Sequence, residues 1–168
     1  MAAKIDYIHR ELEQVITEAA EFFSVISVTG PRQSGKSTLL KHLFPDFQKY
    51  SLKDVNVREF AKNDPIAFLH QTERGMFIDE VQKVPELLEY IQGIVDDNPE
   101  RRFLLSGSSN FEVMRGLSES LAGRAGVYEL MPMSFVEAKE QLEGRNVNTL
   151  LYEGFYPAIC AGKNKAKF

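Results

Sequence analysis

Short segments that read as strands alternate along the chain with segments whose apolar residues recur at helical spacing. The predicted strands lie at 24–29, 48–52, 75–79, 102–106 and 125–130. The predicted helices lie at 4–20, 38–44, 56–61, 65–71, 85–95, 111–117 and 133–142. Strands that alternate with helices favour a mostly parallel sheet covered on both faces, so we predict an α/β fold.

The segment GPRQSGKST at 30–38 has the spacing of a phosphate-binding loop and lies between a predicted strand and a predicted helix. Its two glycines allow close approach of the backbone, so that several N–H groups can converge on one anion. We expect Lys36 to meet the β- and γ-phosphates and the hydroxyl of Ser37 to bind Mg²⁺. The predicted nucleotide-binding residues are Gly30, Pro31, Arg32, Gln33, Ser34, Gly35, Lys36, Ser37 and Thr38.

Two adjacent carboxylates, Asp79 and Glu80, follow the apolar residues 76–78. Adjacent acids repel each other, and the end of an apolar strand is a costly place for them without a cation. We expect Asp79 to hold Mg²⁺, directly or through water, and Glu80 to orient or deprotonate the water that attacks the γ-phosphate. A solvated strand end is the alternative interpretation.

A turn of small polar residues at 106–110 follows the fourth predicted strand. Ser108 or Asn110 is expected to bond the γ-phosphate or the attacking water, and a plain polar turn is the alternative. Arginines that could neutralise charge on the transferred phosphoryl group are Arg32, Arg115 and Arg124. Arg124 directly precedes the fifth strand, and we place it on or near the ligand-bearing edge, with a surface salt bridge as the alternative.

The composition is that of an ordinary globular chain, with 168 residues, 43% hydrophobic content and a net charge of −4. A single domain with one substantial core is expected. The single cysteine, Cys160, excludes an internal disulfide, and the three scattered histidines (His9, His42 and His70) show no metal-ligand spacing. A charged N-terminus and the lack of a long apolar run predict a cytoplasmic protein with no membrane segment.

Together, these motifs resemble a family of prokaryotic AAA-like ATPases of largely unassigned biological role. The matching segments, in family order, are GPRQSGKSTLL at 30–40, MFIDEVQKVPELL at 76–88, FLLSGSSNFEVM at 103–114, SLAGRAGVYELMPMSFVE at 120–137 and YEGFYPAI at 152–159. In this family the first segment is the Walker A loop, the second the Walker B strand with its catalytic glutamate, and the third the sensor-1 strand. The resemblance implies catalytic roles for Lys36 and Glu80, and a sensor in the 106–110 turn.

The resemblance also implies an architecture: a three-layer α/β/α P-loop NTPase with the strand order 5-1-4-3-2, which periodicity alone does not provide. We predict an N-terminal amphipathic helix at 1–22, an ATPase core at 23–135 and a C-terminal helical segment at 136–168. Family members usually continue into a second domain, nuclease-like or of unknown function, so the chain is expected to represent only the ATPase part.

The leading functional hypothesis is a Mg²⁺-dependent ATPase that acts as a nucleotide switch for a C-terminal effector domain, in a homo-oligomer or alone. The acid pair followed by a polar strand end favours this class. A nucleotide-sensing module with little hydrolysis is the second hypothesis. A P-loop kinase is the third, and the lack of clustered arginines for a lid disfavours it. Nucleic acid could meet Arg101, Arg102, Arg115 or the basic tail at 163–167, but no motif supports it and the net charge disfavours it.

Overall fold

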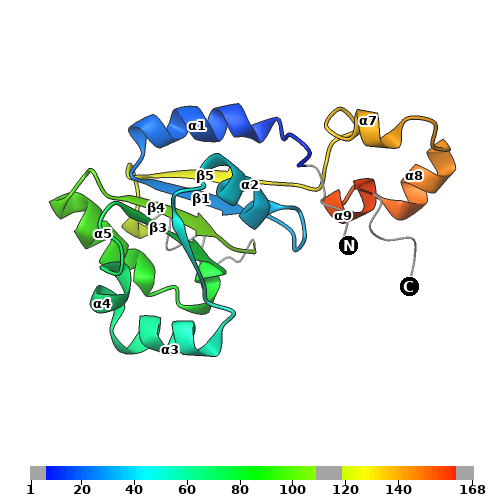
Figure 1. Cartoon of the computed structure of the whole chain (residues 1–168). Coiled ribbons are helices and arrows are strands. Elements are labelled where there is room, and N and C mark those ends of the chain that lie inside the picture. The colour runs from blue at the N-terminus through cyan, green and yellow to red at the C-terminus, as the bar shows by residue number, and fades with distance from the viewer. Residues whose placement is uncertain (1–6, 109–118, 162–168) are drawn as a thin grey trace.

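The fold is built on one parallel sheet, seen in a computed structural model that describes residues 7–108 and 119–161 (Figure 1). The strands are β1 (Val25–Thr29), β2 (Gln48–Ser51), β3 (Gly75–Asp79), β4 (Arg102–Ser106) and β5 (Ala125–Glu129). Their order is β2-β3-β4-β1-β5, and every neighbouring pair is parallel. Read from the other edge this is 5-1-4-3-2, so the predicted fold class and strand order are confirmed.

Helices cover both faces of the sheet, as Figure 1 shows. One face carries α1 (Leu12–Phe22) and α2 (Lys36–Leu43), and the other carries α3 (Val55–Asn63), α4 (Pro65–Leu69) and α5 (Leu87–Asp97). Successive strand residues point to opposite faces. Phe77 therefore packs with the α1–α2 core, while Met76 and Ile78 pack with the α3–α5 core. Because helices cover both faces of the sheet, every residue of β1 and of β3 is buried.

Three short helices follow β5 and lie to one side of the sheet (Figure 1). They are α7 (Lys139–Leu142), α8 (Val147–Glu153) and α9 (Pro157–Cys160). A small apolar cluster of their own holds them together, formed by Met133, Ala138, Leu142, Leu150 and Cys160. Ile8 packs against this cluster, so the segment before α1 joins the C-terminal helices to the rest of the fold.

Several helix boundaries differ from the sequence prediction. The helix expected at 4–20 begins only at Leu12, and the one expected at 133–142 forms only from Lys139. The helix expected to start at Asn56 starts at Val55, because the carboxylate of Asp54 accepts hydrogen bonds from the backbone N–H groups of the first turn. The helix expected at 111–117 falls outside the described residues.

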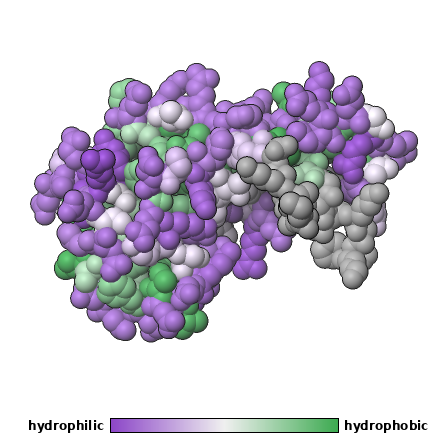
Figure 2. Space-filling view, in the orientation of Figure 1, coloured by the Kyte–Doolittle hydropathy of each residue, from purple (hydrophilic) through white to green (hydrophobic). Residues whose placement is uncertain are grey.

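The surface in the view of Figure 2 is mainly hydrophilic, with apolar side chains gathered over α3 and α4. Val55, Phe60 and Ile66 are the exposed large apolar residues of these two helices. Within the described ranges, no helix combines the length and apolar character needed to cross a bilayer.

Candidate functional site

The loop at 30–38 leaves the carboxyl end of β1 and returns into the first turn of α2. Gln33 and Gly35 have positive φ angles of 66° and 99°, so two residues of the loop adopt the left-handed backbone region. Gly30 has φ 134°, and a Cβ there would lie 2.3 Å from the carbonyl oxygen of Leu130. Only glycine fits this position, and the loop is held close to the chain that follows β5.

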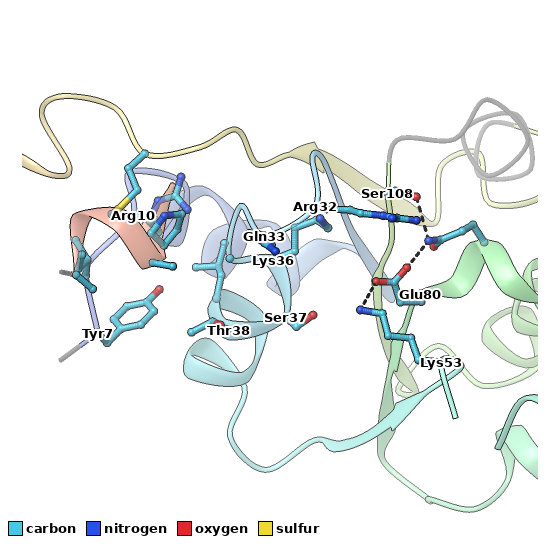
Figure 3. A pocket seen from close by; sticks show the side chains of 18 of the residues that line it. Tyr7, Arg10, Arg32, Gln33, Lys36, Ser37, Thr38, Lys53, Glu80 and Ser108 are labelled. Carbon is cyan, nitrogen blue, oxygen red and sulfur yellow. Dashed lines mark hydrogen bonds and ion pairs between the residues drawn. The ribbon is translucent and has the colours of Figure 1, made fainter. Parts of the chain in front are cut away.

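Lys36 is the first residue of α2, and its side chain is folded back over the loop (Figure 3). The amine donates hydrogen bonds to the carbonyl oxygens of Gly30, at 2.9 Å, and Pro31, at 2.6 Å. Burial lowers the pKa of Lys36, while the nearby carboxylates of Glu80 and Asp79 act in the opposite direction. A partly desolvated cation beside backbone N–H groups at a helix N-terminus is suited to phosphate oxygens.

Asp79 ends β3 and is almost fully buried. Its Oδ1 accepts hydrogen bonds from the hydroxyls of Ser37, at 2.8 Å, and Ser106, at 2.5 Å. Its Oδ2 lies 2.7 Å from the amine of Lys49 on β2. Burial raises the pKa of Asp79, but these three donors outweigh it and hold the pKa below its ordinary value. The carboxylate is therefore ionised at neutral pH.

Glu80 follows Asp79 in a left-handed backbone conformation, with φ 63° and ψ 45°. This conformation is unusual for a residue with a side chain, and the side chain of Glu80 lines the cleft (Figure 3). Its Oε1 lies 2.8 Å from the amine of Lys53, and its Oε2 accepts a hydrogen bond of 2.5 Å from the amide of Gln82. The same amide nitrogen donates to the hydroxyl of Ser108 at 3.0 Å. Glu80 and Ser108 thus share one positioning residue.

Lys36, Glu80 and Ser108 line a cleft of about 1090 Å³, and Asp79 lies behind Ser37, to which it is hydrogen-bonded. One end is polar, with Lys36, Ser37, Lys53, Glu80 and Ser108, and the other is more apolar. Tyr7 lies at this other end (Figure 3), and the apolar residues that line the cleft are Ile8, Leu39, Met133, Pro157, Ala158 and Ala161. The residues present fit Mg²⁺ with a nucleotide. The hydroxyl of Ser37 and the ionised carboxylate of Asp79 are oxygen ligands of the kind that Mg²⁺ prefers. They lie next to the loop, which is too tightly packed at Gly30 for a Cβ.

A family described as AAA domain matches residues 23–139, a range that contains the loop, Asp79, Glu80 and Ser108. The chain belongs to this family. This AAA domain is also 33% identical, over 143 residues, to two uncharacterized mycobacterial proteins, Rv2008c of Mycobacterium tuberculosis and Mb2031c of Mycobacterium bovis. The match covers 84% of this chain and 32% of each relative, so the chain spans about a third of their length.

Solved structures with lower identity share the fold of the AAA domain. The Walker-type ATPase PABY2304 of Pyrococcus abyssi has a TM-score of 0.62 at 17% identity, over 93% of this chain and 66% of its own. The STAND protein PH0952 of Pyrococcus horikoshii, which has a tetratricopeptide repeat sensor, has a TM-score of 0.59 at 9% identity, over 98% and 31%. These likenesses show that the chain shares its fold with both proteins.

The structure brings most of the predicted site residues together, but not Arg124. Arg124 precedes β5, and its carbonyl accepts a hydrogen bond from the backbone of Val25 at the start of β1. It therefore lies at the amino ends of the strands, opposite the loop, and its guanidinium pairs with Asp96. Its predicted place on the ligand-bearing edge is wrong. Arg32 and Arg10 are the arginines among the residues that line the cleft.

Two predicted residues, Asn110 and Arg115, lie outside the described residues. Arg101, a predicted nucleic-acid contact, is buried, and its guanidinium donates to the carbonyl oxygens of Leu69 and Thr72. It is therefore a structural residue, and its side chain is not available to nucleic acid.

Arg10 is a site residue that the sequence analysis missed. Its buried guanidinium donates to the carbonyl oxygens of Ser34 in the loop, at 2.9 Å, and Met131 after β5, at 2.8 Å. Its Nε pairs with Glu137 at 2.9 Å. Arg10 thus joins the segment before α1, the loop and the start of the C-terminal region. No spacing signal marks it, because all three partners are distant in sequence.

Lys49, Lys53 and Gln82 were missed as well. Gln82 lies two residues after Glu80 in the segment that resembles the Walker B strand, and this proximity was the only signal available for it. Lys49 lies in β2 and Lys53 in the turn after it, and no motif in the sequence connects this segment with Asp79 and Glu80.

Proposed function

We propose that this AAA domain binds ATP with Mg²⁺ in the cleft and hydrolyses it to ADP and phosphate. One observation carries the proposal: the hydroxyl of Ser37 and the carboxylate of Asp79 meet at 2.8 Å, on the loop that also carries Lys36. Ser37 and Asp79 would hold Mg²⁺, which when bound supplies positive charge against the β- and γ-phosphate oxygens. The backbone of residues 30–38 and the amine of Lys36 would hold the phosphates.

Glu80 is the proposed general base. It would accept a proton from water while the water oxygen bonds to the γ-phosphorus and the bond from that phosphorus to ADP breaks. Gln82 would keep the carboxylate in position through its 2.5 Å hydrogen bond. The side-chain oxygen of Gln82 is buried with no hydrogen-bond partner among the described residues, so it remains an acceptor for a water or hydroxyl group. Ser108 and Asn110 remain the proposed sensors of the γ-phosphate.

The adenine base is proposed to lie at the apolar end of the cleft. Tyr7 lies at this end (Figure 3), and Ile8 from the same segment and Pro157 and Ala158 from α9 also line the cleft. Arg10 attaches the segment before α1 to the loop through the carbonyl oxygen of Ser34 and pairs with Glu137 ahead of the C-terminal helices. In α9, Pro157 lies 3.6 Å from the place that a Cβ on Gly35 of the loop would take. Nucleotide binding would therefore act on the C-terminal helices directly.

This attachment supports the wider proposal of a cytoplasmic nucleotide switch for an effector region that follows the AAA domain. The relatives extend well beyond the matched region, since 32% of their length is covered. Assembly into a homo-oligomer belongs to the same proposal. Arg124 is remote from the site of its own chain, so it cannot neutralise charge on the phosphoryl group there. An arginine from a neighbouring subunit could take this role.

A second candidate function is nucleotide sensing with little hydrolysis. It is favoured by the contacts of Glu80, whose two carboxylate oxygens are both occupied, one by Lys53 and one by Gln82. Because both oxygens already contact protein groups, Glu80 could accept a proton from water efficiently only after one of these contacts breaks.

Glu80→Gln tests the assignment of the base. We expect the Kd for ATP, measured by calorimetry with Mg²⁺, to change less than about threefold, while phosphate release slows at least about a hundredfold. The control is Glu86→Gln, an exposed glutamate that precedes α5. Full turnover in Glu80→Gln would refute the role of Glu80. If the unmodified chain bound ATP tightly but released phosphate as slowly as Glu80→Gln, the sensing function would be established instead.

A further inference from the structure

Three side chains that commonly bind metals lie together at the far end of α2 from the phosphate loop. They are His9 from the segment before α1, Glu13 from the first turn of α1 and His42 from the last turn of α2. Each offers one ligand atom, and these atoms all lie within 4.8 Å of one another. Distance along the sequence separates His42 from the other two, which is why no metal-ligand spacing is visible in the sequence.

The carboxylate of Glu13 is oriented by its neighbours. Its Oε1 accepts hydrogen bonds from the Tyr7 hydroxyl, at 2.9 Å, and from the backbone N–H of Arg10, at 2.6 Å. Its Oε2 is 3.1 Å from the Nδ1 of His9. One oxygen is thus held by the protein, and the other faces the histidines. Burial raises the pKa of Glu13, but the hydrogen bonds from Arg10, His9 and Tyr7 outweigh it and leave the pKa below its ordinary value.

Tyr7 also orients His42. The two rings are stacked, with their centroids 3.7 Å apart and an interplanar angle of 16°. The ring of His9 lies 5.9 Å from that of His42 at 80°. Tyr7 therefore contacts one ligand through its hydroxyl and a second through its ring. This is the arrangement by which outer residues orient the ligands of a metal site.

We propose that His9, Glu13 and His42 form a binding site for a transition-metal cation of the Zn²⁺ type. Two imidazoles and one carboxylate suit Zn²⁺, Co²⁺ or Ni²⁺, whereas Mg²⁺ and Ca²⁺ prefer oxygen ligands throughout. Ligands of a tetrahedral zinc ion lie about 3.4 Å apart, given bonds of about 2.1 Å. Both histidines are exposed, so rotation of their side chains can close the remaining gap. Water completes the coordination on the solvent side.

The site differs from the proposed Mg²⁺ site in residues, chemistry and place, and it does not depend on nucleotide binding. A bound cation would fasten the segment before α1 to α2. Tyr7 belongs to this segment and lines the nucleotide cleft, so the metal would fix one wall of the apolar end of that cleft. The cluster would then have a structural role, adding to the attachment that Arg10 and the packing of Tyr7 and Ile8 already provide.

The test uses the nucleotide-free chain without a histidine tag, stripped of metal by a chelator and dialysed. Calorimetric titration with Zn²⁺ should show one equivalent bound, and Co²⁺ should give the intense visible absorption of four-coordinate cobalt. His42→Gln should weaken Zn²⁺ binding at least about tenfold, and Tyr7→Phe, which keeps the ring and removes the hydroxyl, should weaken it measurably. His70→Gln, at an exposed histidine after α4, is the matched control and should leave the affinity unchanged.

Circular dichroism melting would verify that each variant is folded. Equal Zn²⁺ affinity in the unmodified chain and in His42→Gln would overturn the proposal, as would the lack of any heat with Zn²⁺. The cluster would then be an ion pair beside an aromatic stack and nothing more. Weakening in His42→Gln with an unchanged His70→Gln would establish the site.

Discussion

The hydroxyl of Ser37 donates a 2.8 Å hydrogen bond to the carboxylate of Asp79. This contact joins the first turn of α2 to the end of β3, and a second hydroxyl, that of Ser106, joins the same oxygen from β4. The loop and the acid pair, which are separate motifs in the sequence, are therefore in direct contact in the folded chain. The ligand set proposed for Mg²⁺ needs little rearrangement.

The first prediction concerns Ser37→Ala. Loss of the hydroxyl removes a proposed Mg²⁺ ligand, so we expect the Kd for ATP to rise at least about tenfold when Mg²⁺ is present. The free energy lost with one hydrogen bond to a charged group corresponds to a change in Kd of that size. In EDTA the Kd should change less than about threefold. Ser37→Thr keeps the hydroxyl and is the control. Equal weakening with and without Mg²⁺ would show that Ser37 supports the loop and not the cation.

The second prediction concerns Gln82→Leu, which keeps the volume of the side chain and removes both hydrogen bonds of the amide. Glu80 and Ser108 lose their shared partner, so we expect kcat to fall roughly tenfold or more, while the Kd for Mg²⁺-ATP stays within about twofold. Gln141→Leu, at an exposed position in α7, is the control. A raised Kd with unchanged kcat would assign Gln82 to nucleotide binding instead of positioning.

The third prediction concerns Gly30→Ala. The new Cβ would lie 2.3 Å from the carbonyl oxygen of Leu130, at φ 134°, so we expect a loss of about 1–3 kcal/mol in the free energy of unfolding. Gly93→Ala is the matched control. Gly93 lies in α5, and apart from its chain neighbours and the backbone of its own helix no atom lies within 4 Å of the place that its new methyl group would take. Alanine there should therefore stabilise the chain by about 0.5–1 kcal/mol. Urea unfolding measures both, and equal effects would contradict the tight packing of the loop.

The fourth prediction concerns pH. Burial raises the pKa of Glu137, but hydrogen bonds from Arg10, Ser134 and Glu11 hold it below its ordinary value in the folded state. The unfolded chain therefore binds more protons as the pH falls below about 4.3, the ordinary value of a glutamate. The free energy of unfolding should decrease from there downward, as the pH falls towards the folded pKa.

Arg10→Met should reduce this acid sensitivity, because the guanidinium that favours ionised Glu137 is gone, and it should also lower stability at neutral pH. Urea unfolding between about pH 3 and pH 7, a range set by the carboxylate pKa values, measures both effects. Lys62→Met, at an exposed lysine in α3, serves as the control. An unchanged pH dependence in Arg10→Met would contradict the ion pair.

Sequence reasoning succeeded where the chemistry is local. The loop at 30–38 and the pair Asp79–Glu80 are contiguous motifs, and their physical demands are visible in a few residues. The strand order was available only through the resemblance, because hydrophobic periodicity marks strands without saying which of them pair. Arg10, Lys49 and Lys53 reach the site through tertiary contacts, and nothing local distinguishes them from solvated charges.

The misplacement of Arg124 has a simple physical cause. In a parallel sheet the carboxyl ends of all strands lie on one side and their amino ends on the other. A residue that immediately precedes a strand therefore lies on the side opposite the carboxyl ends. The position of Arg124 before β5 therefore placed it away from the loop, whatever the flexibility of the residues before it.

The position of β1 in the sheet has a consequence for synthesis of the chain. β1 carries the loop, but its two neighbours are β4 and β5, and the loop rests on Leu130 beyond them. A ribosome therefore releases the loop long before the strands that flank it. Because these pairings are so distant in sequence, they form late. The proposed nucleotide site would therefore be complete only after translation has passed Leu130, and nucleotide capture by a nascent chain would report a completed sheet.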